Sequence, residues 1–159
     1  VNVICSHSAF ALGDLTITPH PVPHDAREPV QFTFTKRERK LAVLTDLGTG
    51  TPHVRSMLNG SNVIVMECNH DKDLLAASDY PASLKNRISG MWGHLSNQAA
   101  AEILAACDLS HLKCLLAAHL SQKNNTPALV RQSLASIRGL NAQHIEILEQ
   151  HQVGQWTEV

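Results

Sequence analysis

Five polar residues of this sequence have side chains suited to metal-ion chemistry, and they are His24, Asp46, Glu67, His94 and His119. Asp46 closes the apolar run LAVLTD and His119 closes the run CLLAAH, a pattern typical of a buried strand that ends on a polar group. The carboxyl ends of strands meet at one edge of an open α/β sheet, so we expect these side chains to lie close together. Imidazole and carboxylate groups in combination form a ligand set that suits Zn²⁺ or Mn²⁺.

Each of these residues also has a plainer interpretation, which the spacing alone leaves open. Asp46 and Glu67 can cap or electrostatically favour the helix that follows each of them. His24 can lie in a surface turn beside Asp25, and His119 can be a buried, hydrogen-bonded histidine. His94 can simply make a capping interaction at the start of the helix that begins near Ser96.

The elements that must position these residues change in kind along the chain. The predicted strands cover 3–5, 15–19, 30–35, 41–44, 62–67, 114–118 and, weakly, 145–148. The predicted helices cover 52–58, 71–77, 82–88, 96–107 and 127–137. The strands up to 41–44 are predicted to form an antiparallel meander. The elements that follow are predicted to alternate between helices and strands. We therefore expect an α/β fold with a mixed sheet and helices on one face, and nothing in this sequence to cover the other face.

Composition limits the class of protein. The chain has 159 residues, of which 43% are hydrophobic and 17% charged, with a formal net charge of −1. These values predict one globular domain over residues 1–159 and argue against disorder or a strongly basic surface. The four cysteines form no CxxC pair, which favours reduced thiols. No apolar run approaches the roughly 18 residues that a membrane span needs. The sequence also does not open with the basic segment and apolar segment of a signal peptide. We therefore expect a cytoplasmic protein with no membrane contact.

Five segments carry a resemblance to a known family. They are PVPHDAREP, VLTDLG, IVMECNHD, WGHLSNQAAAEIL and LLAAHLSQKNN, and together they span residues 21–125. They resemble segments of the metallo-β-lactamase-fold hydrolases, and within that superfamily the YycJ-type exonucleases and the related ribonuclease Z and carbon–phosphorus-lyase phosphodiesterase branches. The resemblance implies the C-terminal part of an αββα sandwich and a metal-dependent hydrolase of phosphodiester bonds, such as a nuclease or phosphodiesterase.

The resemblance also implies roles for individual residues. His24, Asp46 and His119 match metal ligands of the family, and Asp46 matches the carboxylate that bridges two metals. His94 matches the histidine that protonates a leaving oxygen, and Glu67 is expected to orient it. The polar string that follows His119 predicts contacts to substrate phosphate oxygens from Ser121, Lys123, Asn124 and Asn125.

The family's first ligand motif, HxHxDH, does not occur in this sequence. We therefore expect a two-metal site only when an N-terminal half is supplied, because the three ligands present cannot build it alone. The expected partners are nucleic acid or a small phosphodiester, and the uncovered sheet face predicts self-association or pairing with that N-terminal half. A non-catalytic α/β interaction module derived from the same fold is the alternative.

Overall fold

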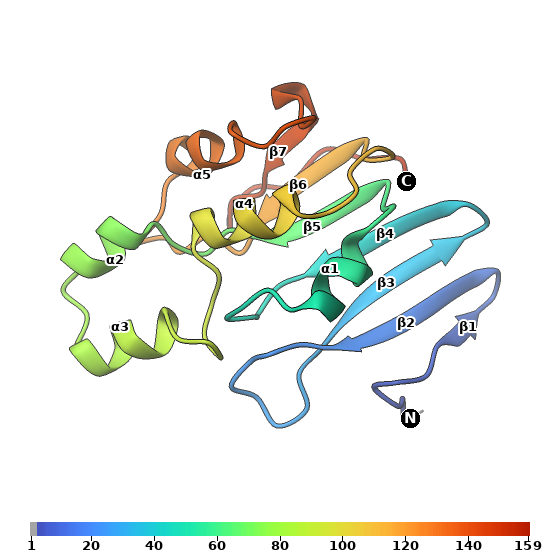
Figure 1. Ribbon diagram of the computed structural model, residues 1–159, viewed down its shortest axis with the longest axis horizontal. Helices are drawn as coiled ribbons and strands as arrows, with labels where there is room; N and C mark the ends of the chain where they lie inside the picture. Colours follow the sequence, from blue (N-terminus) through green and yellow to red (C-terminus); the bar gives the residue numbers. More distant parts are fainter. Residues whose placement is uncertain (1–2) are drawn as a thin grey trace.

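The computed structural model describes residues 3–159, and within that range seven strands form one sheet in sequence order (Figure 1). The strands are β1 Phe10–Leu12, β2 Leu15–Pro21, β3 Val30–Lys36, β4 Arg39–Leu44, β5 Val63–Glu67, β6 Cys114–Ala118 and β7 Ile145–Ile147. The helices are α1 Pro52–Leu58, α2 Lys72–Ala77, α3 Ala82–Ile88, α4 Asn97–Ala105 and α5 Pro127–Leu134, and a 3₁₀ turn covers Ala142–His144. The α/β class and the mixed sheet predicted from the sequence are confirmed.

The sheet changes direction of pairing at β4. Strands β1 to β4 pair antiparallel as a meander, whereas β4, β5, β6 and β7 pair parallel. In the parallel part Leu44 lies opposite Met66, and Glu67 lies opposite Ala118. Strands β4, β5 and β6 therefore end at the same edge of the sheet, and the residues that follow them emerge side by side.

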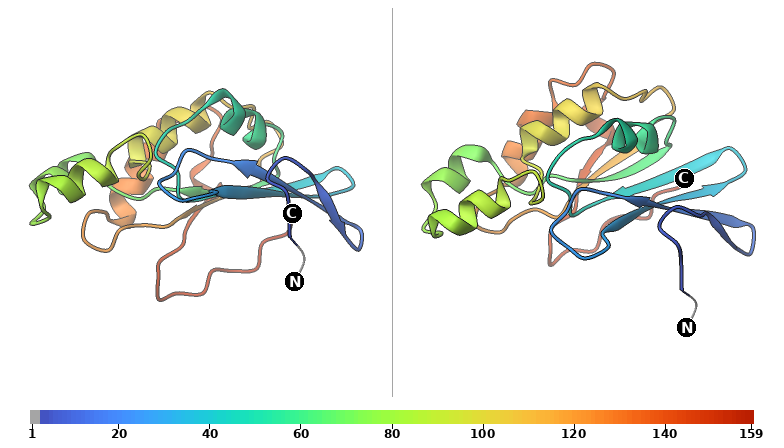
Figure 2. Two further views of the ribbon diagram at one scale, coloured as in Figure 1. Left: turned by 90° about the horizontal axis from the view of Figure 1, so that it is seen from below. Right: turned by 60° about the horizontal axis from the view of Figure 1, so that its bottom comes forward.

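The core lies between the sheet and the helices on one of its faces (Figure 2). Alternate sheet residues such as Leu44, Ile64 and Leu115 are fully buried against side chains from α1, α4 and α5. All the α-helices except α3 begin at a polar cap, as α4 does at Ser96, whose hydroxyl accepts a hydrogen bond from the Ala99 backbone N–H. None of the helices in residues 3–159 is long and apolar enough to cross a bilayer.

In the part of the chain that the structure describes, no helix packs on the opposite face of the sheet (Figure 2). Leu41, Val43, Val65 and Leu116 are only half-buried there. The segment that follows β7 crosses below this face in the left view of Figure 2, and Val159 lines a cavity on it. This corrects the expectation that nothing in the chain would cover the face, because the C-terminal residues shield part of it.

Two details at the start of the chain also differ from the sequence prediction. Residues 3–5 form no strand, and Val3 is 95% exposed because no neighbouring strand pairs with it. The first strand is β1, which pairs antiparallel with β2 through Phe10 and Ile17. An alternating apolar pattern was a poor guide at this end, since pairing also requires a partner in register.

Candidate active site

The edge where β4, β5 and β6 end carries three of the predicted residues. Glu67 is the last residue of β5, whereas Asp46 and His119 follow β4 and β6. Both of the latter adopt left-handed backbone conformations, with φ of +53° at Asp46 and +59° at His119. Such conformations are uncommon outside glycine and cluster at functional sites, where the surrounding structure holds them in place.

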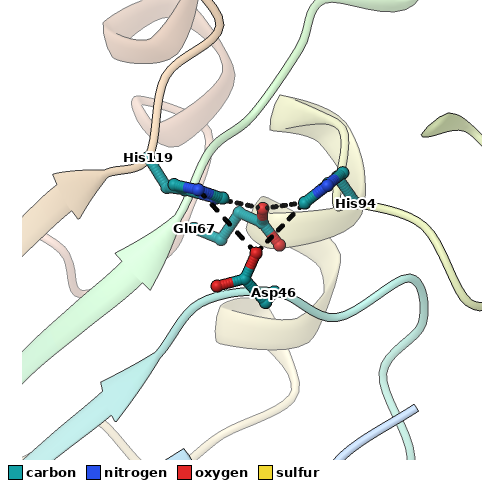
Figure 3. A group of neighbouring side chains, drawn as sticks. All are labelled: Asp46, Glu67, His94 and His119. Atoms are coloured by element: carbon teal, nitrogen blue, oxygen red, sulfur yellow. Dashed lines mark hydrogen bonds and ion pairs between the residues drawn. The ribbon is translucent and has the colours of Figure 1, made fainter. Parts of the chain in front are cut away.

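Four side chains gather at this edge (Figure 3). Asp46, Glu67, His94 and His119 each offer a potential ligand atom, and these atoms lie within 4.8 Å of one another. His24 approaches the same group from the loop after β2, with its Nε2 atom 3.9 Å from Asp46 Oδ1. The structure therefore brings together all five residues that the sequence analysis singled out.

Glu67 is fully buried at the centre of the cluster. Its Oε1 atom accepts hydrogen bonds from the Nδ1 atoms of His94, at 2.7 Å, and His119, at 2.8 Å. Its Oε2 atom accepts hydrogen bonds from the backbone N–H groups of Leu47 and Leu95. A carboxylate offers about four acceptor positions, so these four donors engage it fully. Glu67 is thus equipped to orient the two histidines rather than to bind a metal itself.

The electrostatics of Glu67 and His119 agree with this arrangement. Burial alone would raise the pKa of Glu67, but the hydrogen bonds from His119 and His94 outweigh it and hold the pKa below its ordinary value. The pKa of His119 is raised, first of all by its hydrogen bond to Glu67. A buried carboxylate that stays ionised at neutral pH fixes the proton of each histidine on Nδ1.

With Nδ1 engaged, Nε2 is the atom left to act in each histidine. His119 Nε2 lies 3.8 Å from Asp46 Oδ1. His24 Nδ1 donates to the Gly93 carbonyl oxygen at 3.1 Å, so His24 Nε2 also faces Asp46 with its lone pair. Ligand atoms of a tetrahedral zinc ion are roughly 3.4 Å apart when its bonds are about 2.0–2.1 Å. Each of the two nitrogen atoms therefore lies close to the ligand spacing of a zinc-type ion from the Asp46 oxygen, whereas His24 is not among the four residues whose ligand atoms all lie within 4.8 Å of one another.

Three loops from distant parts of the chain hold these groups in place. The Asp25 backbone N–H donates to the Trp92 carbonyl oxygen at 2.9 Å, and the Gly48 N–H donates to the Pro23 carbonyl oxygen at 2.9 Å. A Cβ atom added at Gly48 would collide with the backbone of Met91. The loops that carry His24, Asp46 and His94 thus contact one another directly, and Gly48 allows this close approach.

The four predicted phosphate contacts do not share one environment. Ser121 and Lys123 line a cleft together with His119. Asn124 and Asn125 are buried, and the Asn125 amide exchanges hydrogen bonds with Asn97 and donates to the Cys68 carbonyl oxygen. The structure thus places two of the four beside His119 and the other two in the interior, and the phosphate role remains a prediction.

An ion pair that no sequence pattern indicates holds the loop of His24. The Arg87 guanidinium binds the Asp25 carboxylate, which lies 62 positions away in the sequence. This ion pair holds the pKa of Asp25 below its usual range. Arg87 lies on α3 and is spaced like an ordinary surface charge, so no pattern in the sequence pointed to this contact.

Most of this chain matches one known protein family. Residues 1–120 match the family described as the beta-lactamase superfamily domain. The chain belongs to the β-lactamase superfamily. This agrees with the metallo-β-lactamase resemblance noted in the sequence.

Curated relatives within the superfamily are exodeoxyribonucleases. The chain is 37% identical over 125 residues to exodeoxyribonuclease YycJ of Bacillus anthracis, covering 79% of this chain and 47% of the relative. It is 31% identical over 124 residues to exodeoxyribonuclease WalJ of Streptococcus pneumoniae serotype 2, covering 78% of this chain and 46% of the relative. The chain spans about half the length of the curated relatives it matches.

Solved structures show the superfamily fold as well. The metallo-β-lactamase fold protein YhfI of Bacillus subtilis superposes with a TM-score of 0.66 at 14% identity, covering 92% of this chain and 52% of YhfI. The Zn²⁺-bound PqqB of Methylobacterium extorquens has a TM-score of 0.60 at 16% identity, covering 91% of this chain and 48% of PqqB. At such low identity these similarities establish the fold alone.

Proposed function

We propose that this chain supplies the C-terminal part of a metal-dependent nuclease or phosphodiesterase. The observation that carries the proposal is the position of Asp46 Oδ1, which lies 3.8 Å from His119 Nε2 and 3.9 Å from His24 Nε2. Hydrolysis of phosphodiester bonds in nucleic acid is favoured because the two curated relatives are exodeoxyribonucleases.

His24, Asp46 and His119 would hold Zn²⁺ or Mn²⁺, with Asp46 facing both histidines. When bound, such an ion supplies an activated water and polarises a phosphoryl oxygen. His94 stands beside these ligands, with its Nδ1 atom 3.8 Å from Asp46 Oδ1 and hydrogen-bonded to Glu67. We assign His94 the role of general acid, in which its Nε2–H donates a proton to the departing oxygen while Glu67 stabilises the imidazolium. Glu67 is a positioning residue in this scheme.

The proposal includes a second polypeptide half. Two-metal chemistry requires more ligands than His24, Asp46 and His119 provide, and an N-terminal half carrying HxHxDH would supply them. That half would pack on the apolar sheet face formed by Leu41, Val43, Val65 and Leu116. Support comes from the length of the relatives, since this chain spans about half of each. We place the activity in the cytoplasm, where the four free thiols would stay reduced.

Hydrolysis of bis(p-nitrophenyl) phosphate with added Mn²⁺ or Zn²⁺ tests the proposal. The assay compares this chain with a longer protein that also contains the polypeptide encoded upstream of Val1. Elemental analysis measures the metal ions bound to each protein. We expect the longer protein to bind metal and hydrolyse the ester, and Asp46→Asn and His119→Ala to lose roughly 10²-fold or more of both affinity and activity. His144→Ala is the matched surface control. A longer protein with neither metal nor activity would contradict the proposal and favour a non-catalytic interaction module.

A further inference from the structure

A cleft of about 640 Å³ lies directly beside the candidate metal ligand His119. Its lining also includes Tyr80, Leu120, Lys123 and Leu148. We propose that this cleft binds the nucleotide next to the scissile phosphate, with the base on Tyr80 and a flanking phosphate on Lys123. This inference rests on the proposed function and makes it narrower, because the substrate becomes a nucleic-acid strand rather than any small phosphodiester.

Tyr80 supplies the surface for the base. It lies between α2 and α3, and Pro81 follows it, which restricts its backbone to extended conformations. Tyr80 is half-buried, so little freedom is lost when a base stacks on its ring, and Leu120 and Leu148 add apolar walls to the same cleft. Stacking of a base on an aromatic ring tolerates every sequence because each base has a π-face.

Lys123 supplies the charge for the phosphate. Its Nζ atom lies 5.3 Å from the centroid of the Tyr80 ring, so the cation and the aromatic surface form one unit. Its carboxylate neighbour is Asp79, at 3.7 Å, and both side chains are mostly exposed, 61% for Lys123 and 81% for Asp79. An ion pair this exposed is weak, so Lys123 can turn toward a phosphate at little cost.

The loop between His119 and Lys123 keeps the cleft at a fixed distance from the metal ligands. The Asn69 side-chain amide donates to the His119 carbonyl oxygen at 3.0 Å, and the Ser121 backbone N–H donates to the Asn69 carbonyl oxygen at 2.8 Å. The Asn124 backbone N–H donates to the Ser121 hydroxyl at 3.2 Å. A strand held at the metal ligands would therefore place its neighbouring nucleotide against a preformed surface.

Binding of a fluorescein-labelled dT₁₀ single strand to this chain, in EDTA and measured by anisotropy, tests the inference without any need for catalysis. Tyr80→Leu should weaken binding by roughly 5- to 100-fold, as loss of one stacked base does, whereas Tyr80→Phe should stay within about twofold of the wild type. Lys123→Met should lower the slope of log affinity against log salt by about 0.7. Trp156→Leu and Lys113→Met are the controls, because both are exposed and Lys113 precedes β6 at its opposite end.

The outcomes separate this inference from the proposed function. A wild-type chain that does not bind dT₁₀, or Tyr80→Leu and Lys123→Met proteins that bind as the wild type does, would overturn the inference. On the longer protein, kcat/KM for dT₁₀ should fall in Tyr80→Leu by the same factor as binding, whereas Trp156→Leu should leave kcat/KM unchanged for both dT₁₀ and bis(p-nitrophenyl) phosphate. Normal dT₁₀ binding with no hydrolysis of either substrate would instead contradict the proposed function alone.

Discussion

Glu67 Oε1 accepts a hydrogen bond from His94 Nδ1 at 2.7 Å, which joins a fully buried carboxylate to an imidazole that is 25% exposed. The same oxygen binds His119 Nδ1, so one carboxylate sets the orientation of both a candidate proton donor and a candidate metal ligand. Its second oxygen is anchored by backbone N–H groups from two loops. The geometry of the site is therefore centred on Glu67, a residue that need not touch the substrate.

His94→Ala should separate proton donation from metal binding. In the longer, metal-loaded protein the loss should reach roughly 10²- to 10⁴-fold for a nucleic-acid substrate, because an alkoxide needs a proton as it leaves. The loss should be much smaller for bis(p-nitrophenyl) phosphate, since p-nitrophenolate leaves without protonation. Bound metal, measured by elemental analysis, should remain at the wild-type level. Equal losses on both substrates would contradict the general-acid role.

Glu67 should make the stability of the metal-free protein depend on pH at the acid end. Its folded-state pKa is lowered, so its ionised form stabilises the fold above about pH 4.3, and this contribution is lost as the pH falls through the folded pKa. Urea unfolding in EDTA should show a steeper decline between about pH 5 and pH 3 for the wild type than for Glu67→Gln. Glu102→Gln, an exposed matched change, should keep the wild-type slope.

His119 should make the stability of the metal-free protein depend on pH in the opposite direction from Glu67. Its pKa is raised by Glu67, so its charged form stabilises the metal-free fold fully below about pH 6.5 and loses this effect as the pH rises through the folded pKa. A ¹H–¹⁵N NMR titration of the imidazole in EDTA should place its midpoint above the ordinary histidine value of about 6.5. A midpoint at or below that value would count against an ionised Glu67 in the cluster.

The Cys68 thiol should not react with thiol reagents while the protein is folded. Burial raises the pKa of its thiol to about 12, whereas the pKa of the exposed Cys5 is lowered by hydrogen bonds from His7 and Ser8. Titration with a thiol reagent at pH 8 should therefore show a fast phase that Cys5→Ser removes, and Cys68 should react only after unfolding. A Cys68→Ser protein that loses the fast phase would contradict this assignment.

Gly48→Ala should damage both stability and the site. The new methyl group would collide with the backbone of Met91, so the loops carrying Asp46 and His94 must separate. We expect a loss of about 2–4 kcal/mol in urea unfolding, in the range of changes that force a backbone shift. Gly60→Ala meets no atom within 4 Å and has φ of +69°, so its cost should stay near about 1 kcal/mol.

Periodicity and strand ends predicted the part of the site that depends on sheet order. Asp46, Glu67 and His119 follow apolar runs, and the parallel pairing of β4, β5 and β6 brings them to one edge as expected. The position of His94 depends instead on contacts between loops, such as the approach of Gly48 to Met91, which leave no periodic signal. Its proposed role as general acid therefore depends on the family resemblance.

The polar string after His119 shows a second limit of sequence reasoning. Ser121, Lys123 and Asn125 lie in one short loop and have similar polarity, yet Lys123 is exposed and Asn125 is buried against Asn97. The difference depends on which side of the loop faces α4, and this is decided by tertiary packing. Tyr80 was missed for a related reason, because its partner Lys123 is distant in the sequence.

The left-handed backbone at Asp46 and His119 restricts which amino acids either position can accept, whether or not a metal is bound. Glycine, asparagine, aspartate and histidine adopt this conformation most readily, and β-branched residues resist it. In a saturation library selected only for folding, both sites should thus enrich the same small set of residues. Asparagine at position 46 would remove the anionic ligand while keeping the backbone conformation of the turn. Of the possible substitutions, it should therefore abolish metal binding with the least effect on folding.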